Sequence, residues 1–298
     1  MKILNIGSLN LDYTYAVPHF VAEGETLAAL DRQDHCGGKG LNQSIAAARA
    51  GAEVFHAGKI GAEGGRLKEL LRGSGADVSF VDTCPVPTGH AVIQVNPGGQ
   101  NCILIFGGAN RQITKDDVTG YLTHFSAGDI LLVQNETSSI DAAITAASAK
   151  GMRVALNPSP ISPELLSSPA LALVDYFILN EGEGFALTGQ QEPEAICRSL
   201  HQTYPRCQVM LTLGAEGSVF FDGSRFLRQP AFRVSAVDTT GAGDTFTGFF
   251  LSGIASGMDM AENLRRASMA SALAVGKPGA AASIPTLSEV EAALDRQK

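Results

Sequence analysis

The stretch DTTGAGDTF, residues 238–246, leads into the apolar run TFTGFFLSGIA, which predicts a helix. Gly241, Ala242 and Gly243 are small enough for successive backbone N–H groups to point into one concavity at the start of that helix. Free N–H groups there act together with the positive end of the helix dipole. The stretch therefore predicts an anion-binding site at a helix N-terminus.

Asp244 follows this turn and is expected about one residue inside the helix. An acidic residue in the first turn is favoured by the helix dipole, which is a sufficient reason for its position. Alternatively, Asp244 removes a proton from a substrate hydroxyl while the nearby amides stabilise a phosphoryl group during its transfer. These residues alone leave both interpretations open.

Short apolar runs alternate with helix-length segments along most of the chain. Near-continuous apolar strands that are joined by helices predict a parallel sheet covered on both faces, which is an α/β fold. The expected strands are residues 3–7, 54–61, 129–134, 153–157, 175–180 and 208–214, and the clearest expected helices are 41–51, 65–73 and 138–151.

Residues 12–36 and 88–107 interrupt this alternation and are predicted to form additional strands. The second segment alternates apolar and polar residues around the turn NPGGQ, which favours a hairpin. Such strands either form a lid over the sheet or extend its edge, and the sequence does not decide between the two. We expect a single domain, 1–298, into which the two segments are inserted.

Composition narrows the class of protein. The chain has 298 residues, is 45% hydrophobic and carries a net charge of −8, which argues against a nucleic-acid partner. Its five cysteines are scattered, so we expect reduced thiols in a cytoplasmic protein rather than a zinc site or disulfides. The segment MKILNIGSLN predicts a first strand rather than a signal peptide, and we expect no membrane span.

Polar residues follow most of the predicted parallel strands. Ligands bind at the carboxyl ends of strands in open α/β sheets, so these residues are candidates for a shared site. They are Asn10 and Asp12, Glu136, Asn157, Asn180 and Glu183, and Gly214.

Four further motifs have both a functional and a structural explanation. GGKGLNQ (37–43) either lets a ligand approach Lys39 and Asn42 or begins a helix. GSLNLD (7–12) either offers polar groups to a polyol or forms an Asx turn. NEGE (180–183) either holds Mg²⁺ or caps a helix, and TLGAEG (212–217) either presents backbone to a nucleotide or forms a hairpin turn.

These motifs, with NPSP (157–160), occur in an order that resembles the ribokinase-like (phosphofructokinase-B) family of sugar kinases. The resemblance extends from Lys2 to about Pro285, and DTTGAGDTF and GGKGLNQ carry most of its specificity. It implies a three-layer α/β/α domain with a small β lid, and dimers that pair through the lid. It also implies ATP-dependent phosphorylation of a sugar hydroxymethyl group, with Mg²⁺ as cofactor and K⁺ as activator.

The resemblance also implies residue roles. Asp244 would be the catalytic base, with Gly241, Ala242 and Gly243 as the anion hole. Sugar hydroxyls would be held by Asn10, Asp12, Gly38, Lys39, Asn42 and Glu136. The nucleotide would be bound by Asn180, Thr212, Gly214, Gly217 and Ser268. Glu183 would hold Mg²⁺ through water, and Asp238, Thr240, Gly279 and Ser283 would hold K⁺.

Three residues depart from the family pattern. Ser44 stands where alanine is common, and Leu11 and Leu41 are bulkier than expected beside a ribose. Ribose is therefore the first choice of acceptor, while deoxyribose, fructose or another small sugar, and a nucleoside, stay open. A non-catalytic binding protein is disfavoured because the base and the anion hole are both present, and no G-x-G-x-x-G follows the first strand as a dehydrogenase would require.

Overall fold

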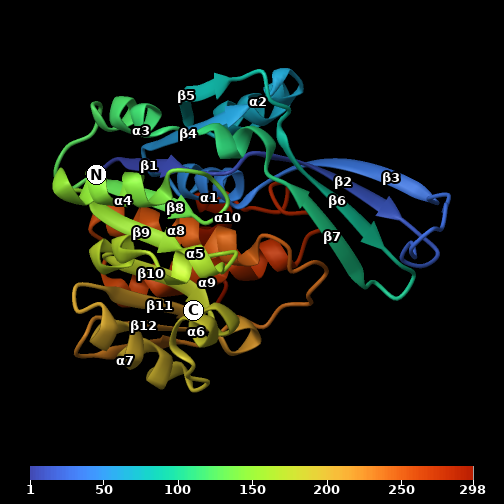
Figure 1. Ribbon diagram of the computed structural model, residues 1–298. Helices are drawn as coiled ribbons and strands as arrows, with labels where there is room; N and C mark the ends of the chain where they lie inside the picture. Colours follow the sequence, from blue (N-terminus) through green and yellow to red (C-terminus); the bar gives the residue numbers. More distant parts are fainter. Residues whose placement is uncertain (298) are drawn as a thin grey trace.

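Residues 1–297 are described by a computed structural model, in which nine strands form a central sheet and four strands form a second sheet. The central sheet has the order β13-β12-β11-β10-β9-β8-β1-β4-β5 (Figure 1). Its strands are β1 (Ile3–Ile6), β4 (Val54–Ile60), β5 (Asp77–Thr83), β8 (Ile130–Gln134), β9 (Arg153–Asn157), β10 (Tyr176–Asn180), β11 (Gln208–Thr212), β12 (Ser218–Phe221) and β13 (Phe226–Gln229).

The strand pairs from β5 across to β11 are all parallel, as predicted from the alternating pattern. Only β12 pairs antiparallel with its neighbours β11 and β13. Every residue of β8 is buried, because helices cover both faces of the sheet. The chain order reverses at β1, which lies between β4 and β8, and such a reversal is where open α/β sheets bind ligands.

Two helical layers enclose the sheet. Alternate strand residues point to opposite faces, so Ile3 packs in one cluster and Leu4 in the other. One face is covered by α1 (Lys39–Arg49), α2 (Gly65–Gly73), α8 (Ala242–Ser256), α9 (Met260–Val275) and α10 (Leu287–Asp295). The other is covered by α3 (Lys115–Leu122), α4 (Ile140–Ala149), α5 (Pro163–Leu166), α6 (Glu181–Thr188) and α7 (Pro193–Thr203). The result is the expected three-layer α/β/α architecture.

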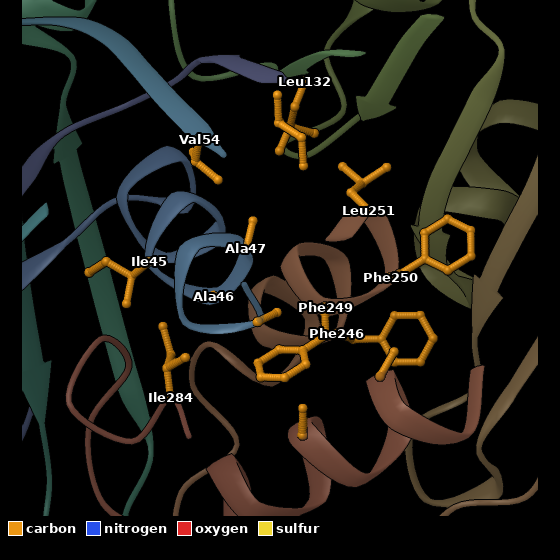
Figure 2. Close-up of a cluster of buried hydrophobic side chains, with 14 of the residues drawn as sticks. Ile45, Ala46, Ala47, Val54, Leu132, Phe246, Phe249, Phe250, Leu251 and Ile284 are labelled. Atoms are coloured by element: carbon orange, nitrogen blue, oxygen red, sulfur yellow. The ribbon is translucent and has the colours of Figure 1, made fainter. Parts of the chain in front are cut away.

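Helices α1 and α8 lie side by side in the core. Figure 2 shows Ala46 of α1 beside Phe249 of α8. Gly248 lets the two helices approach closely, since a Cβ there would lie 2.4 Å from the Cβ of Ala46. This contact fixes the start of α8 relative to the start of α1.

The second sheet has the order β3-β2-β6-β7 and projects from the main body (Figure 1). Its strands are β2 (Asn10–Ala16), β3 (Asp31–Gly37), β6 (Gly89–Val95) and β7 (Asn101–Phe106). They come from the two segments that interrupt the parallel pattern, and β6 and β7 form the hairpin expected around NPGGQ. The expected small sheet is therefore separate from the central sheet rather than an extension of its edge.

Short 3₁₀ turns link several elements: η1 (Ala62–Gly64), η2 (Gly108–Gln112), η3 (Pro169–Leu173) and η4 (Gly214–Glu216). Among residues 1–297, we find no helix with the length and apolar character needed to cross a bilayer.

Candidate active site

The anion-binding turn lies at the start of α8. Gly241 is the N-cap with φ 76°, so the helix begins at Ala242 and Asp244 is its third residue rather than about its first. The N–H of Ala242 donates to Thr239 O at 3.3 Å, whereas no acceptor within residues 1–297 is found for the N–H groups of Gly241, Gly243 and Asp244. Free amides therefore remain at the positive end of the helix dipole.

The carboxylate of Asp244 is buried, with 8% of the residue exposed, and amides hold it on both sides. Asn42 Nδ2 donates to Oδ2 at 2.9 Å, and Gln43 Nε2 donates to Oδ1 at 2.9 Å. Both donors come from the first turns of α1. The position satisfies the helix dipole and also holds an oriented carboxylate beside free amides, so the structure accommodates both interpretations of Asp244.

Lys39 is the first residue of α1 and lies among carboxylates. Burial alone would lower the pKa of its ammonium group, but the charges of Asp244, Glu136 and Glu183 raise it above its ordinary value. Lys39 is therefore a firmly charged cation facing the site, which excludes the interpretation of a solvent-exposed lysine at a helix start.

Glu136 follows β8 and reaches across to the start of α1. Its Oε2 accepts hydrogen bonds from the hydroxyl of Ser8 and, at 3.2 Å, from the backbone N–H of Lys39. Burial raises the pKa of Glu136, and the bond from Ser8 offsets part of that effect. Glu136 thus links the ends of β1 and β8 at the point where the chain order reverses.

Asn10 and Asp12 begin the strand that carries the chain from the central sheet into the second sheet. Asn10 is buried and accepts from Asn110 Nδ2 at 2.8 Å. Burial, with a contribution from the charge of Glu136, raises the pKa of Asp12 to about 6. Asp12 and Glu136 therefore face the same polar region between the two sheets.

The NEGE motif caps α6, as its structural explanation predicted. Asn180 Oδ1 accepts from the N–H of Glu183, and Glu183 Oε2 accepts from the N–H of Asn180 at 3.0 Å. Both residues nevertheless line a pocket with Lys39 and Asp244. Within residues 1–297 no group of three or more His, Cys, Asp or Glu side chains is placed to hold a metal ion by itself.

Two adjacent pockets lie around the start of α8 and share Thr212, Thr239 and Gly243. The smaller, about 220 Å³, is lined by Asp244 together with Lys39, Asn180 and Glu183. The larger, about 610 Å³, is mostly apolar and is lined by four of the predicted nucleotide residues: Thr212, Gly214, Gly217 and Ser268. Of the predicted sugar residues, only Lys39 lines either pocket.

TLGAEG forms the turn between the antiparallel strands β11 and β12, as its structural explanation predicted. Because this turn also lines the larger pocket, its two explanations are compatible.

Of the four residues predicted to bind K⁺, three are joined by hydrogen bonds: Asp238, Thr240 and Gly279. Asp238 accepts from the N–H of Thr240 and the N–H of Gly279, both at 2.9 Å. Burial would raise the pKa of Asp238, but hydrogen bonds from the side chain and backbone of Thr240 and from the backbone of Gly279 outweigh it and lower the pKa. Ser283 is buried and donates instead to Ala280 O at 2.8 Å.

Leu11 and Leu41 were expected to crowd a sugar, yet both are in the hydrophobic core, with 3% and 0% exposed. Sequence reasoning also missed Gln43, which contacts Asp244 directly although it is part of GGKGLNQ. Asn5 and Gln134 were missed too, and the available signal was a polar residue inside each of the apolar strands ILNI and ILLVQ.

The chain matches the sequence model described as pfkB family carbohydrate kinase over residues 1–287. It is 37% identical to a ribokinase of Haemophilus influenzae, covering 95% of each chain, and 31% identical to a deoxyribokinase of Salmonella typhi, covering 97% of each. A solved Arabidopsis thaliana ribokinase, complexed with ribose and ATP, has a TM-score of 0.85 at 33% identity, with 98% of each chain covered. This chain therefore belongs to the pfkB family of carbohydrate kinases.

Proposed function

We propose that this protein is an ATP-dependent sugar kinase that phosphorylates the hydroxymethyl group of ribose to give ribose 5-phosphate. The observation that carries the proposal is the carboxylate of Asp244, which lies beside the free amides of Gly243 and Asp244 and opens to a pocket next to a larger apolar one. The Arabidopsis relative with ribose and ATP supports the choice of both substrates.

The transfer needs a base, an anion site and a cation. Asp244 accepts the proton of the hydroxymethyl group as its oxygen forms a bond to the γ-phosphorus, and the bond from that phosphorus to the leaving ADP oxygen breaks. The free amides stabilise the negative charge on the transferred group, with Gly241 shaping the turn and Ala242 contributing its weakly held N–H. Lys39 adds a fixed positive charge.

The apolar pocket would hold the nucleotide base, against Thr212, Gly214, Gly217 and Ser268. The hydroxyl of Ser268 is buried without a hydrogen-bond partner in residues 1–297, as expected of a group that binds a ligand. Asn180 lies in the smaller pocket and would face the phosphates.

The sugar would bind between the central sheet and the second sheet, held by Asn10, Asp12, Gly38, Lys39, Asn42 and Glu136. Asn42 supports this placement, since its Nδ2 is used by Asp244 while its Oδ1 is buried and has no partner in the described chain. That oxygen is free to accept from a sugar hydroxyl. The second sheet, including 12–36 and 88–107, would act as the lid of the single domain and exclude water.

Mg²⁺ that arrives with ATP would neutralise part of the phosphate charge. Glu183 fits a contact through water, because only one of its carboxylate oxygens, Oε2, caps α6, and the residue lines the smaller pocket. The loop of Asp238, Thr240 and Gly279 adjoins Gly241 and would hold K⁺ with Ser283 nearby; the carboxylate of Asp238 keeps lone pairs beyond its two backbone bonds.

We further propose that the protein is a cytoplasmic homodimer. All five cysteines are free, which is consistent with a reducing compartment. Edge strand β7 exposes Ile103, Leu104, Ile105 and Phe106, on both of its faces, and a second copy of the lid would cover them.

The test measures ADP release with ATP, Mg²⁺ and K⁺ against ribose, deoxyribose, fructose and nucleosides. We expect the highest kcat/KM with ribose, and we expect Asp244→Asn to lower kcat by about 10²–10⁴-fold. Deoxyribose is the second candidate because of the Salmonella relative. A higher kcat/KM with deoxyribose would change the assigned acceptor and leave the proposed mechanism unchanged. Wild-type turnover by Asp244→Asn would exclude Asp244 as the catalytic base.

A further inference from the structure

A continuous chain of buried amides leads from Asp244 into the interior of the central sheet. Gln43 Nε2 donates to Asp244 Oδ1 at 2.9 Å, and Gln134 Nε2 donates to Gln43 Oε1 at 2.7 Å. Gln134 Nε2 also donates to Asn5 Oδ1 at 3.0 Å. Gln43, Gln134 and Asn5 are each 0% exposed, and they come from α1, β8 and β1.

The contacts allow only one orientation of the Gln43 amide. Its two N–H groups are both used, by Asp244 Oδ1 and, at 3.0 Å, by Asn157 Oδ1, while its oxygen accepts from Gln134. A flipped amide would place its oxygen against two acceptor oxygens and its nitrogen against a donor. The hydrogen bond from Gln134 to Gln43 Oε1 therefore fixes the orientation in which Gln43 Nε2 faces Asp244.

The far end of the chain is also fixed. Asn5 Nδ2 donates to Gly40 O and to Ser44 Oγ, both at 2.8 Å, and Ser44 Oγ lies 2.8 Å from His56 Nδ1. Burial lowers the pKa of His56 to about 4, so the ring is neutral at neutral pH. No solvent reaches these groups, because Asn5, Ser44 and His56 are 0% exposed.

We propose that Gln43 is a positioning residue, which fixes the plane of the Asp244 carboxylate for proton removal, and that Gln134 acts on Asp244 only through Gln43. This inference rests on the proposed role of Asp244 as the base. Nothing else in the described chain holds Oδ1, whereas Oδ2 is held by Asn42. Without Gln43, only the hydrogen bond from Asn42 restrains rotation of the carboxylate about its bond to Cβ. A small misplacement of a reacting group is costly in rate.

The test uses Gln43→Met and Gln134→Met, which keep the length of the side chain and remove the hydrogen bonds. We expect Gln43→Met to lower kcat about 10–100-fold with the KM values for sugar and ATP nearly unchanged. The pH profile of kcat is recorded for both variants and for the wild type. The charged groups that face Asp244, Lys39 and Glu136, are unchanged in this variant.

A double-mutant cycle distinguishes positioning from general damage. If Gln134 acts only through Gln43, the double variant has the kcat of Gln43→Met alone. The matched control is Asn263→Leu, which removes a fully buried amide that bonds only Phe250 O and lies outside the chain of amides. We expect it to lower Tm while leaving kcat and its pH profile unchanged.

The outcomes are separable from those of the proposed function. If Asp244→Asn is inactive but Gln43→Met and Gln134→Met keep the kcat and pH profile of the wild type, the positioning role is wrong and the base stands. A KM increase without a change in kcat or in the pH profile would also overturn the role. If Gln43→Met does not fold, Gln134→Met decides by the same criteria, with a smaller expected loss of kcat.

Discussion

Asp12 is a carboxylate whose surroundings disfavour its charge. Its folded pKa, raised to about 6, lies above the ordinary value of 3.8, because burial and Glu136 oppose ionisation. Between those two values the folded state binds more protons than the unfolded state, so stability falls as pH rises from about 4 to above 6. At neutral pH the protein therefore carries the full cost of this charge, as is common for groups retained for function.

The first prediction follows from this cost. Asp12→Asn removes the unfavourable charge but keeps the shape, so we expect Tm at pH 8 to rise by about 2–4 °C. The variant should also bind the sugar more weakly, with a raised KM, because an ionised acceptor is lost.

The wild type should show the same effect with pH: the sugar KM rises as pH falls below about 6, where Asp12 becomes protonated. The measurements are thermal unfolding at pH 5 and pH 8 and sugar KM from pH 5 to 8. The gain in Tm should be smaller at pH 5 than at pH 8, and it should vanish only near pH 4, where Asp12 is protonated in both the folded and the unfolded state. A pH-independent KM for the wild type would exclude Asp12 from sugar binding.

Residue types and motif order were enough to predict where the polar groups gather, but not what each one contacts. Asn42 was expected to contact the sugar, and the structure shows that its nitrogen holds Asp244. Leu11 and Leu41 were expected in the pocket and lie in the core. Such differences depend on which side of a turn faces the ligand. The order of residue types along the chain does not specify that direction at the start of a helix.

At the scale of elements, the predicted strands and helices agree closely with the structure because each has strong periodicity. The start of α8 shifted because Gly241, with φ 76°, takes the N-cap position and lets Ala242 begin the helix. The position of α1 against α8 could not be predicted, since it depends on Gly248 and the small side chains that it meets, which are distant in sequence.

Gly248→Ala tests how much the site depends on this helix contact. The added methyl would lie 2.4 Å from Ala46 Cβ and 2.5 Å from the backbone N of Ala47, so the helices must separate. We expect a loss of about 1–3 kcal/mol in the free energy of unfolding. The separation should also lower kcat, because Asp244 is carried by α8 and its amide donors by α1.

Denaturant unfolding and steady-state kinetics measure the two effects of Gly248→Ala. Gly253→Ala is the control on the same helix, since its Cβ would meet the side chain of Asn263 of α9 rather than α1. That variant should lose stability with a smaller loss of kcat. Equal losses of kcat in both would argue against a specific dependence on the α1–α8 contact.

For the whole molecule, the sequence predicted a parallel sheet with additional strands from two inserted segments, because periodicity of two replaced the strand–helix alternation at two points. The pattern left open whether these strands extend the sheet or form a lid, and only the family resemblance implied a lid. It did not predict that β2 and β6 would pair in parallel, since residues 10–16 and 89–95 are joined only by contacts distant in sequence. The second sheet also exposes apolar side chains of β7 that nothing in the described chain covers.

The last prediction concerns that surface. A strand with one face on a core buries alternate residues, but β7 buries none, and Leu104 and Ile105 are 72% and 59% exposed on opposite faces. If the second sheet of another copy covers β7, either Leu104→Glu or Ile105→Glu should convert the dimer into a monomer. Sedimentation velocity at micromolar concentration measures this change, and the variant that becomes monomeric identifies the buried face of β7. Leu227→Glu, on edge strand β13 of the central sheet, should leave the dimer intact. A monomeric wild type, or a dimer that survives both lid substitutions, would place the interface elsewhere or remove it.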